Sequence, residues 1–333
     1  MRFGPVPLDQ ALGVVLAHSV SLTQGRLRKG IILGAAEIAL LRAEGVDHVV
    51  AARLDAGDVA EDEAASALAA ALVPDPLGQG LRVTEAFTGR VNLNATGAGV
   101  VEVDAGAVLA LNLIDPSITL ATLPPLMRVQ AGTLVGTVKI IAYGVEVRAL
   151  QQACAAARAA VRVRPVGMRT ASLVLTEVAG QEDKLTAKGR RAVEARLQAL
   201  GMRLTGVEVV PHRISAIAAA LGRAGGDMVL ILTGSATSDL HDTAPEALRR
   251  AGGVVERFGM PVDPGNLLFL GSLAGRAVVG LPGCARSPAL NGADWVLERL
   301  ACGIAVSGAD IAAMGVGGLL KEIPTRPQLR EPK

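Results

Sequence analysis

The chain has 333 residues and a mass of 34.0 kDa, and at about 100–200 residues per domain this length predicts two domains, or three. Half of the residues are hydrophobic and only 2% are aromatic, so the composition excludes wholesale disorder and argues against a protein that stacks RNA or DNA bases on aromatic rings. The 33 basic and 31 acidic residues nearly balance, and they provide no overall field for nucleic acid or an acidic membrane.

Cysteine usage and hydropathy set further limits. Cys154, Cys284 and Cys302 are far apart and form no CxxC, so we expect neither a disulfide framework nor a zinc site, in keeping with a reducing cytoplasm. The mean hydropathy is +0.42, but no uninterrupted apolar run reaches about 18 residues. We therefore expect no membrane-spanning helix.

Residues 1–80 are predicted to form an N-terminal α+β region. The spacing of apolar residues predicts a helix over residues 35–44, which Gly45 ends, and a strand over residues 46–50. Residues 61–72 predict an Ala-rich amphipathic helix.

Residues 81–145 are predicted to form a β-rich subdomain, because short alternating runs are separated there by Gly, Asn and Asp. The composition of residues 132–141 is that of a strand. Residues 146–167 are predicted as a helical connector, over residues 147–160, followed by a linker, over residues 162–167.

Residues 168–305 show a strict alternation of strands and helices. The predicted strands cover residues 171–175, 204–210, 228–232, 267–270 and 277–279, and the predicted helices cover residues 186–200, 215–224, 245–250 and 288–300. Such alternation is typical of a three-layer, doubly wound α/β domain with a mainly parallel sheet covered on both faces. Residues 306–333 are predicted as a C-terminal tail.

Ligands of open α/β sheets bind beyond the carboxyl ends of the strands, so the loops that follow strands are the candidate sites. The first such loop offers hydroxyls, two carboxylates and small residues: Thr233, Gly234, Ser235, Ala236, Thr237, Ser238, Asp239, Leu240, His241 and Asp242. Thr243 and Glu246 fit a capping box, and the free N–H groups of a helix start suit a phosphate. A capped, solvated loop is the alternative. His241 is the histidine kept as a site candidate, because the four histidines show no metal-binding spacing.

Two further loops are weaker signals. Asp263, Pro264, Gly265 and Asn266 contain an ordinary Pro-Gly turn. The third loop contains Pro282, Gly283, Cys284, Ala285, Arg286 and Ser287, with Ser287 predicted as a helix N-cap and Pro288 at the first helical position. Arg286 beside a helix start suits a phosphate or carboxylate, and an exposed structural arginine fits the sequence equally well. No base can be assigned to activate Cys284.

Several enzyme classes are excluded by their missing motifs. The chain contains no G-x-x-x-x-G-K-[ST], no G-x-G-x-x-G after a strand and no G-x-S-x-G, so it has neither a P-loop, nor a dinucleotide fingerprint, nor a nucleophile elbow.

Taken together, the three loops resemble the molybdopterin-binding domain shared by molybdopterin molybdotransferases and molybdopterin adenylyltransferases. The resemblance covers about residues 168–303 and rests on Thr233-Gly234 through Asp242 with Pro245-Glu246-Ala247, on Pro264-Gly265-Asn266, and on Gly280 through Ala285. The chain departs from the family pattern at Ser235 (Gly in the family), at Asn266 (Lys) and at Cys284-Ala285 (Asn-Pro). These departures resemble a divergent subfamily that is often fused to a domain like the molybdenum-cofactor cytidylyltransferases.

The resemblance implies a site and a ligand. It implies that molybdopterin is bound by residues 233–238, 263–266 and 282–284, together with Arg286 and Ser287. Its phosphate is expected near the backbone of residues 235–238. The family's acidic residues correspond to Asp242 and, with less support, Asp239; no metal is assigned, although Mg²⁺ at Asp242 fits the enzymatic alternative.

Two functions follow from the resemblance. The first is a molybdopterin-binding protein of molybdenum cofactor biosynthesis or maturation, which holds molybdopterin, a nucleotide derivative of it or the finished cofactor for a partner such as a nucleotidyltransferase or a molybdoenzyme-maturation protein. The alternative is an enzyme that performs Mg²⁺-dependent adenylyl transfer or molybdate insertion. A scaffold that has lost the ligand is a third, structural option. We expect a cytoplasmic homo-oligomer that binds neither nucleic acid nor membrane.

Overall fold

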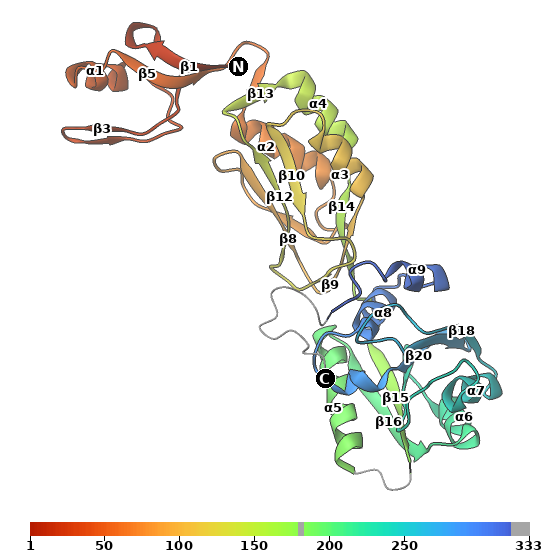
Figure 1. The fold of residues 1–333 in the computed structure, drawn as a ribbon. Helices are drawn as coiled ribbons and strands as arrows, with labels where there is room; N and C mark the ends of the chain where they lie inside the picture. Colours follow the sequence, from red (N-terminus) through yellow and green to blue (C-terminus); the bar gives the residue numbers. More distant parts are fainter. Residues whose placement is uncertain (179–182, 321–333) are drawn as a thin grey trace. The chain divides into compact units, whose positions relative to one another are not determined.

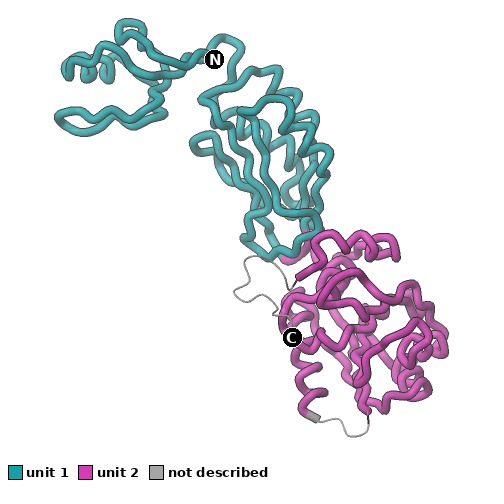
Figure 2. The backbone as a smooth tube through the Cα atoms, viewed as in Figure 1, with its two compact units in different colours: residues 1–97, 101–164 teal, residues 98–100, 165–333 magenta. Residues whose placement is uncertain are grey.

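The computed structural model describes residues 1–178 and 183–320, which divide into two compact units (Figures 1 and 2). Unit 1 comprises residues 1–97 and 101–164, and unit 2 comprises residues 98–100 and 165–333. No helix in the described part of the chain has the length and apolar character needed to cross a membrane.

The first part of unit 1 is a small α+β arrangement. Strands β1 (Arg2–Pro7), β5 (His48–Arg53) and β2 (Val15–Leu16) form one antiparallel sheet, and β3 (Val20–Leu22) pairs with β4 (Gly25–Leu27). Helix α1 (Ala35–Ala43) forms where the sequence predicts it and is followed by Gly45 at a φ of 72°. The core of this first part of unit 1 includes Leu16, Leu33 and Leu41.

The rest of unit 1 is built from antiparallel strands and three helices. One sheet has the order β10 (Ile118–Thr122), β12 (Leu134–Ile140), β8 (Arg90–Ala95), β7 (Leu81–Val83), and another has the order β11 (Arg128–Val129), β9 (Gly99–Val103), β14 (Val161–Pro165). Strand β13 (Gly144–Glu146) pairs with β6 (Asp58–Ala60), and α2 (Glu61–Leu72), α3 (Ala105–Asn112) and α4 (Val147–Ala156) complete the unit.

Two segments of unit 1 differ from the sequence interpretation. The predicted linker over residues 162–167 is wrong, because β14 alternates buried Val161 and Val163 with more exposed arginines and therefore pairs as a strand. Helix α3 was not predicted, because its apolar run has no clear helical period; Asp104 caps it by accepting the Ala107 N–H.

Unit 2 contains a six-stranded sheet of order β16-β15-β17-β20-β19-β18. The strands are β15 (Thr170–Glu177), β16 (Arg203–Pro211), β17 (Met228–Leu232), β18 (Val254–Phe258), β19 (Phe269–Leu273) and β20 (Arg276–Leu281). Strands β16, β15, β17 and β20 are parallel neighbours, and β19 and β18 extend the sheet in antiparallel pairs.

Helices cover both faces of this sheet. On one face, Leu173 and Leu230 pack in the same core as α5 (Asp183–Ala199) and α8 (Gly292–Ala301). On the other, Val174 and Ile231 pack with α6 (Ile214–Arg223) and α7 (Thr243–Arg250). Successive residues of a strand point to opposite faces, so one apolar run serves both cores. This arrangement confirms the three-layer, mainly parallel α/β fold.

The predicted tail is folded as far as the structure describes it. Helix α9 (Gly308–Ala313) buries Ile311, and Met314 and Val306 join the same core. Strand-like pairing of Asp263 with Leu319 holds the segment that follows. Residues 321–333 of the predicted tail lie outside the described residues.

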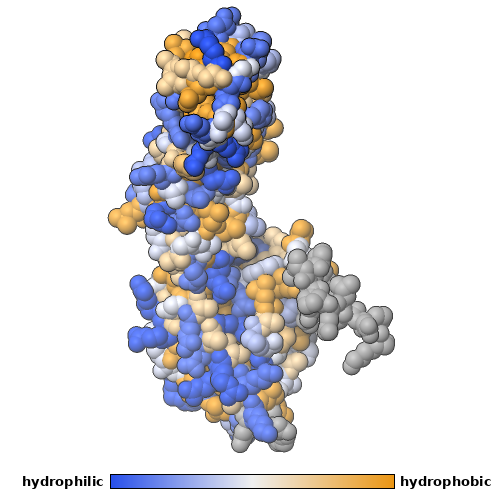
Figure 3. Space-filling model, turned by 90° about the vertical axis from the view of Figure 1, so that its left-hand side faces the viewer, coloured by the Kyte–Doolittle hydropathy of each residue, from blue (hydrophilic) through white to orange (hydrophobic). Residues whose placement is uncertain are grey.

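Exposed apolar side chains are dispersed. Leu77, Phe87 and Val316 are among the most exposed, and the face drawn in Figure 3 shows hydrophobic residues interspersed with hydrophilic ones. Dispersed exposure of this kind is ordinary for protein surfaces. The high mean hydropathy therefore reflects chiefly the Ala, Val and Leu side chains of the cores.

Candidate functional site

The carboxyl ends of neighbouring strands bring the candidate loops together at one end of the sheet in unit 2. We call this end, where the parallel strands stop, the carboxyl edge. Leu232, the last residue of β17, lies opposite Leu175 of β15 on one side and Leu281 of β20 on the other. Phe269, at the start of β19, pairs with Gly280 near the end of β20, so the β18–β19 connection reaches the same edge. The chain order also reverses between β15 and β17, which is where open α/β sheets bind ligands.

The first loop, residues 233–242, keeps some backbone donors available. Thr233 and Thr237 are buried, and the Gly234 N–H donates to Thr176 Oγ1 at 2.8 Å. The N–H groups of residues 235–237 have no hydrogen-bond partner within the described residues. Ser238 is different, because its N–H donates to Asp242 Oδ2 at 2.8 Å. Three adjacent donors of this kind suit an oxyanion.

Asp242 is the N-cap of α7. Its Oδ1 accepts the Thr243 N–H at 2.6 Å, while Oδ2 holds Ser238. The predicted capping box on Thr243 is therefore wrong: the carboxylate of Asp242 takes the cap, and Glu246 instead pairs with Arg249 at 3.1 Å. Burial alone raises the pKa of Asp242, but these hydrogen bonds, with the charge of His212, outweigh it and lower the pKa.

Asp239 and His241 lie at the exposed tip of the first loop. The Asp239 carboxylate accepts the His241 N–H at 2.7 Å, which closes a local turn. The His241 side chain is exposed, so the histidine retained from the sequence lies on the surface of the loop.

A second histidine, His212, was not predicted as a site residue but lies half-buried at the same end of the sheet. His212 Nδ1 is 2.9 Å from Oγ1 of Thr176, the same hydroxyl that accepts the Gly234 N–H. Burial lowers the pKa of His212, and the charge of Asp242 partly opposes this shift. His212 directly follows the last residue of β16, and this position at a carboxyl strand end was the available signal.

The third loop places Arg286 between the ends of β17 and β20. Residues 283–286 form a short 3-10 helix, η2 (Gly283–Arg286), and the half-buried Arg286 donates from Nη2 to the Thr233 carbonyl at 2.6 Å. Its Nε is buried without a hydrogen-bond partner among the described residues. Burial lowers the pKa of Arg286. Arg286 thus ties the third loop to the first and retains an unused donor.

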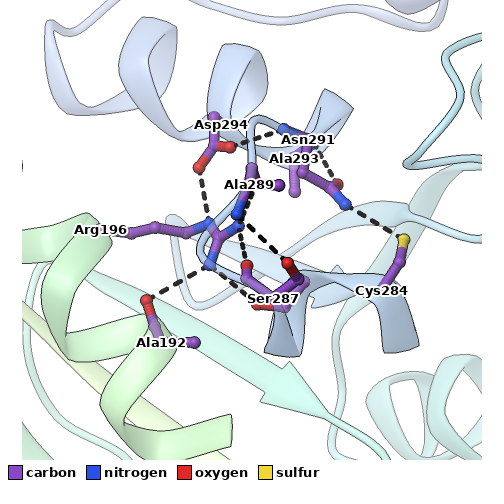
Figure 4. Close-up of polar contacts among 9 residues, drawn as sticks. Ala192, Arg196, Cys284, Ser287, Ala289, Asn291, Ala293 and Asp294 are labelled. Atoms are coloured by element: carbon purple, nitrogen blue, oxygen red, sulfur yellow. Dashed lines mark hydrogen bonds and ion pairs between the residues drawn. The ribbon is translucent and has the colours of Figure 1, made fainter. Parts of the chain in front are cut away.

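Ser287 does not begin the following helix, as the sequence suggested. It has extended backbone angles after η2, and its Oγ accepts the Ala289 N–H at 3.3 Å. Helix α8 begins at Gly292, because Asn291 and Asp294 form a capping box that residues 287–288 do not offer. Asn291 also donates from Nδ2 to the exposed Cys284 Sγ at 3.1 Å (Figure 4).

The second loop, residues 263–266, packs against the start of α8. The Gly292 N–H donates to the Pro264 carbonyl at 2.8 Å, and Asp263–Pro264 is a cis peptide bond. A Cβ on Gly265 would lie 3.0 Å from the backbone of Gly292, so this approach requires glycine. The Asn266 side chain is exposed and donates to the Met260 carbonyl at 3.3 Å.

Hydrogen bonds therefore link the three predicted loops into one assembly: Arg286 joins the first to the third, and the start of α8 joins the third to the second. We call residues 233–242, 263–266 and 282–287 the carboxyl-edge site. Within the described residues, no group of three or more His, Cys, Asp and Glu side chains is arranged to hold a metal ion.

Comparison with known families assigns the second unit. Residues 174–301 match the family model described as "Probable molybdopterin binding domain". This part of the chain is therefore similar to the molybdopterin-binding family. The match spans β15 to α8, and with them all three loops of the carboxyl-edge site, so it ties this part of the chain to molybdenum cofactor biosynthesis. Residues 5–53 match a family described as "Domain of unknown function (DUF8806)".

Two solved structures of molybdenum cofactor biosynthesis proteins show a low similarity to the chain. A molybdopterin biosynthesis MoeA protein from Pyrococcus horikosii is 14% identical, with 91% of this chain and 76% of that chain covered and a TM-score of 0.31. A MogA structure is 21% identical, with 40% of this chain and 91% of that chain covered and a TM-score of 0.27. No curated protein matches the chain.

Proposed function

We propose that the molybdopterin-binding domain of this chain binds molybdopterin, or the finished molybdenum cofactor, at the carboxyl-edge site and hands it to a partner protein. The family of residues 174–301 supports the ligand, and the position of the loops at the switch point of the sheet supports the place. A nucleotidyltransferase or a molybdoenzyme-maturation protein is the partner we propose, with a homo-oligomer in the cytoplasm as the working form.

The unused Nε of Arg286 carries this proposal. A buried charged donor without a partner costs about 1–3 kcal/mol, and an oxyanion would remove that cost. The N–H groups of residues 235–237 lie in the loop to which Arg286 is bonded. A terminal phosphate is the part of molybdopterin that these donors suit, because it is anionic and accepts several hydrogen bonds.

Binding and hand-over are favoured over catalysis by the state of Asp242. Both of its oxygens accept backbone N–H groups, so a structural role as an N-cap accounts for this carboxylate. Asn266 and Cys284 also stand where the related enzymes have Lys and Asn. We therefore derive no step through Mg²⁺; adenylyl transfer or molybdate insertion remains the second candidate, supported by the carboxylates of Asp239 and Asp242 in the first loop.

Mass spectrometry of the pterin that co-purifies from cells making the cofactor tests the proposal. The expected result is molybdopterin, with or without molybdenum, in wild-type protein and much less of it in Arg286→Ala protein. Arg250→Ala is the matched control, because this arginine is exposed at the far end of α7. Absence of any pterin from the wild-type protein, together with no binding on titration with molybdopterin, would contradict the proposal.

A further inference from the structure

Arg196 of α5 lies beneath the third loop, and all three nitrogens of its guanidinium donate hydrogen bonds. Its side chain is only 8% exposed, and Nε donates to Asp294 Oδ1 at 2.7 Å (Figure 4). Nη1 donates to the Ala285 carbonyl at 2.8 Å and Nη2 to the Ser287 carbonyl at 2.8 Å. Longer bonds reach Ala192 and Ala289, at 3.3 and 3.1 Å. All three nitrogens of one buried cation are therefore committed.

These bonds hold the backbone on both sides of Arg286. Ala285 and Ser287 are its two neighbours in the chain, and both give their carbonyl oxygens to Arg196. Asp294, the acidic partner, accepts the Asn291 N–H through its other oxygen at 2.8 Å and so fixes the start of α8. One guanidinium thus ties α5 to the third loop and to the helix that follows it.

The same face of α5 also lies beside the Arg286 side chain. Gly189 precedes Arg196 by seven residues, which is about two helical turns and places both on one face. A Cβ at Gly189 would lie 2.8 Å from Leu232 Cδ2 and 3.7 Å from Cγ and Nε of Arg286. A side chain at this position would therefore crowd Leu232 at the end of β17, whereas its distance to Arg286 is that of an ordinary contact.

We propose that Arg196 is a positioning residue that fixes Arg286 and Ser287 in their binding geometry before the ligand arrives. The proposal rests on the proposed function for its ligand, but the preorganisation itself is a property of the free protein. Without the hydrogen bonds from the Arg196 guanidinium, residues 285–289 would become ordered only when the ligand binds. The entropy cost of this ordering would then lower the affinity for the ligand. A lysine keeps the charge but lacks the planar fork that serves several carbonyls and a carboxylate at once.

Arg196→Lys tests this proposal, and Arg191→Lys is the matched control because Arg191 is exposed on the same helix. The first readout needs no ligand. Cys284 is exposed in the third loop, so its rate of reaction with a thiol reagent, assigned by peptide mass spectrometry, reports whether the loop is held. We expect Arg196→Lys to change this rate several-fold and Arg191→Lys to leave it unchanged. An unchanged rate in folded Arg196→Lys protein would overturn the proposal.

The second readout is the affinity for molybdopterin in a double-mutant cycle with Arg286→Ala. If Arg196 acts through Arg286, Arg196→Lys weakens binding about tenfold in the wild type and has little further effect in Arg286→Ala protein. Additive losses would assign Arg196 a merely structural role and overturn the proposal. If no variant binds molybdopterin, the proposed function fails, while the Cys284 rates still decide whether Arg196 positions the loop.

Asp294→Asn provides a second variant if Arg196→Lys protein does not fold. It removes the charge of Asp294 and leaves one side-chain oxygen in place of two, so either the bond from Arg196 or the bond from the Asn291 N–H is lost. We expect the Cys284 rate and the affinity to change in the same direction as in Arg196→Lys, by a smaller factor. Unaltered values for both in folded Asp294→Asn protein would count against the positioning role.

Discussion

Buried polar side chains divide unevenly between the two units. Among the described residues eight polar or charged side chains are buried, and only Gln79 belongs to unit 1. Gln79 donates from Nε2 to the Leu72 and Val161 carbonyls, which is a structural role. The seven in unit 2 are Ser172, Thr176, Arg196, Thr233, Thr237, Asn291 and Glu298.

The difference follows from how the two units are connected. In an antiparallel sheet the loops that follow successive strands alternate between the two ends, whereas in a parallel sheet all strand-to-helix loops lie at the carboxyl ends of the strands. Irregular backbone at that edge must find hydrogen-bond partners, and side chains such as Thr176, Arg196 and Asn291 provide them. The buried polar side chains that bond these loops support the site that we propose in unit 2.

The largest expected effect comes from opening a cavity in one unit at a time. Leu230→Ala and Leu93→Ala each remove a fully buried leucine, from unit 2 and unit 1 respectively, and each should lower the free energy of unfolding by about 2–5 kcal/mol. Only Leu230→Ala should also weaken molybdopterin binding, because β17 leads directly into the first loop. Thermal unfolding and ligand titration measure both quantities. Equal losses of affinity in the two variants would show that the site is not confined to unit 2.

The second effect in size concerns Arg286. Arg286→Ala removes charge-assisted hydrogen bonds worth about 1.5–3 kcal/mol, so binding of molybdopterin should weaken roughly ten- to a hundred-fold. Isothermal titration measures the dissociation constant, with Arg250→Ala as the exposed control on α7. Affinity equal to that of the wild type would place the anion elsewhere in the molecule.

Much of unit 2 could be predicted from the sequence because its signals are local. Met228 through Leu232 is apolar throughout and forms β17 with the predicted bounds. Strand β18 was missed, since Glu256 and Arg257 interrupt its apolar pattern at the edge of the sheet. The sequence also indicated that the first and third loops would lie together, because parallel strands present their carboxyl ends at one edge, whereas the second loop reaches that edge through the antiparallel pairing of β19 with β20.

The residues that hold the site together could not be predicted in the same way. Arg196 lies in a helix of mixed charge, and the sequence does not distinguish it from the exposed Arg191. The role of Arg196 depends on carbonyls about 90 residues away in the chain. The start of α8 was also misplaced: Asn291, and not Ser287, is its N-cap, because Asn291 and Asp294 have the spacing that a capping box needs. Long-range polar contacts have no periodic signature.

A smaller effect is expected at Asp242. Asparagine is nearly as good an N-cap as aspartate, so Asp242→Asn should leave molybdopterin binding within about tenfold, or about 1.4 kcal/mol, with or without Mg²⁺. Asp242→Ala, which removes the cap, should cost about 1 kcal/mol of stability. Titration and thermal unfolding provide the two values.

The same variant separates carrier from enzyme. Wild-type protein incubated with molybdopterin, ATP or CTP, Mg²⁺ and molybdate should release neither pyrophosphate nor AMP if the chain only binds and hands over its ligand. Release of either product that disappears in Asp242→Asn protein would reject the carrier function and establish the enzymatic one. Asp239→Asn is the companion variant, because Asp239 is exposed and is not the N-cap.

The smallest expected effect is a pH dependence that His212 confers on unit 2. Burial holds the pKa of His212 below its usual value of 6.5, so the unfolded chain takes up the proton first as the pH falls. The contribution of His212 to stability is therefore complete above about pH 6.5 and declines as the pH falls through the lowered folded value. Thermal unfolding between about pH 7.5 and 5.5 should show a shallower decline in His212→Gln than in wild-type protein.

His241→Gln is the control, because its exposed ring makes no contact of the kind that His212 makes with Thr176. Identical slopes in wild-type and His212→Gln protein would show that His212 does not cause the pH dependence of stability.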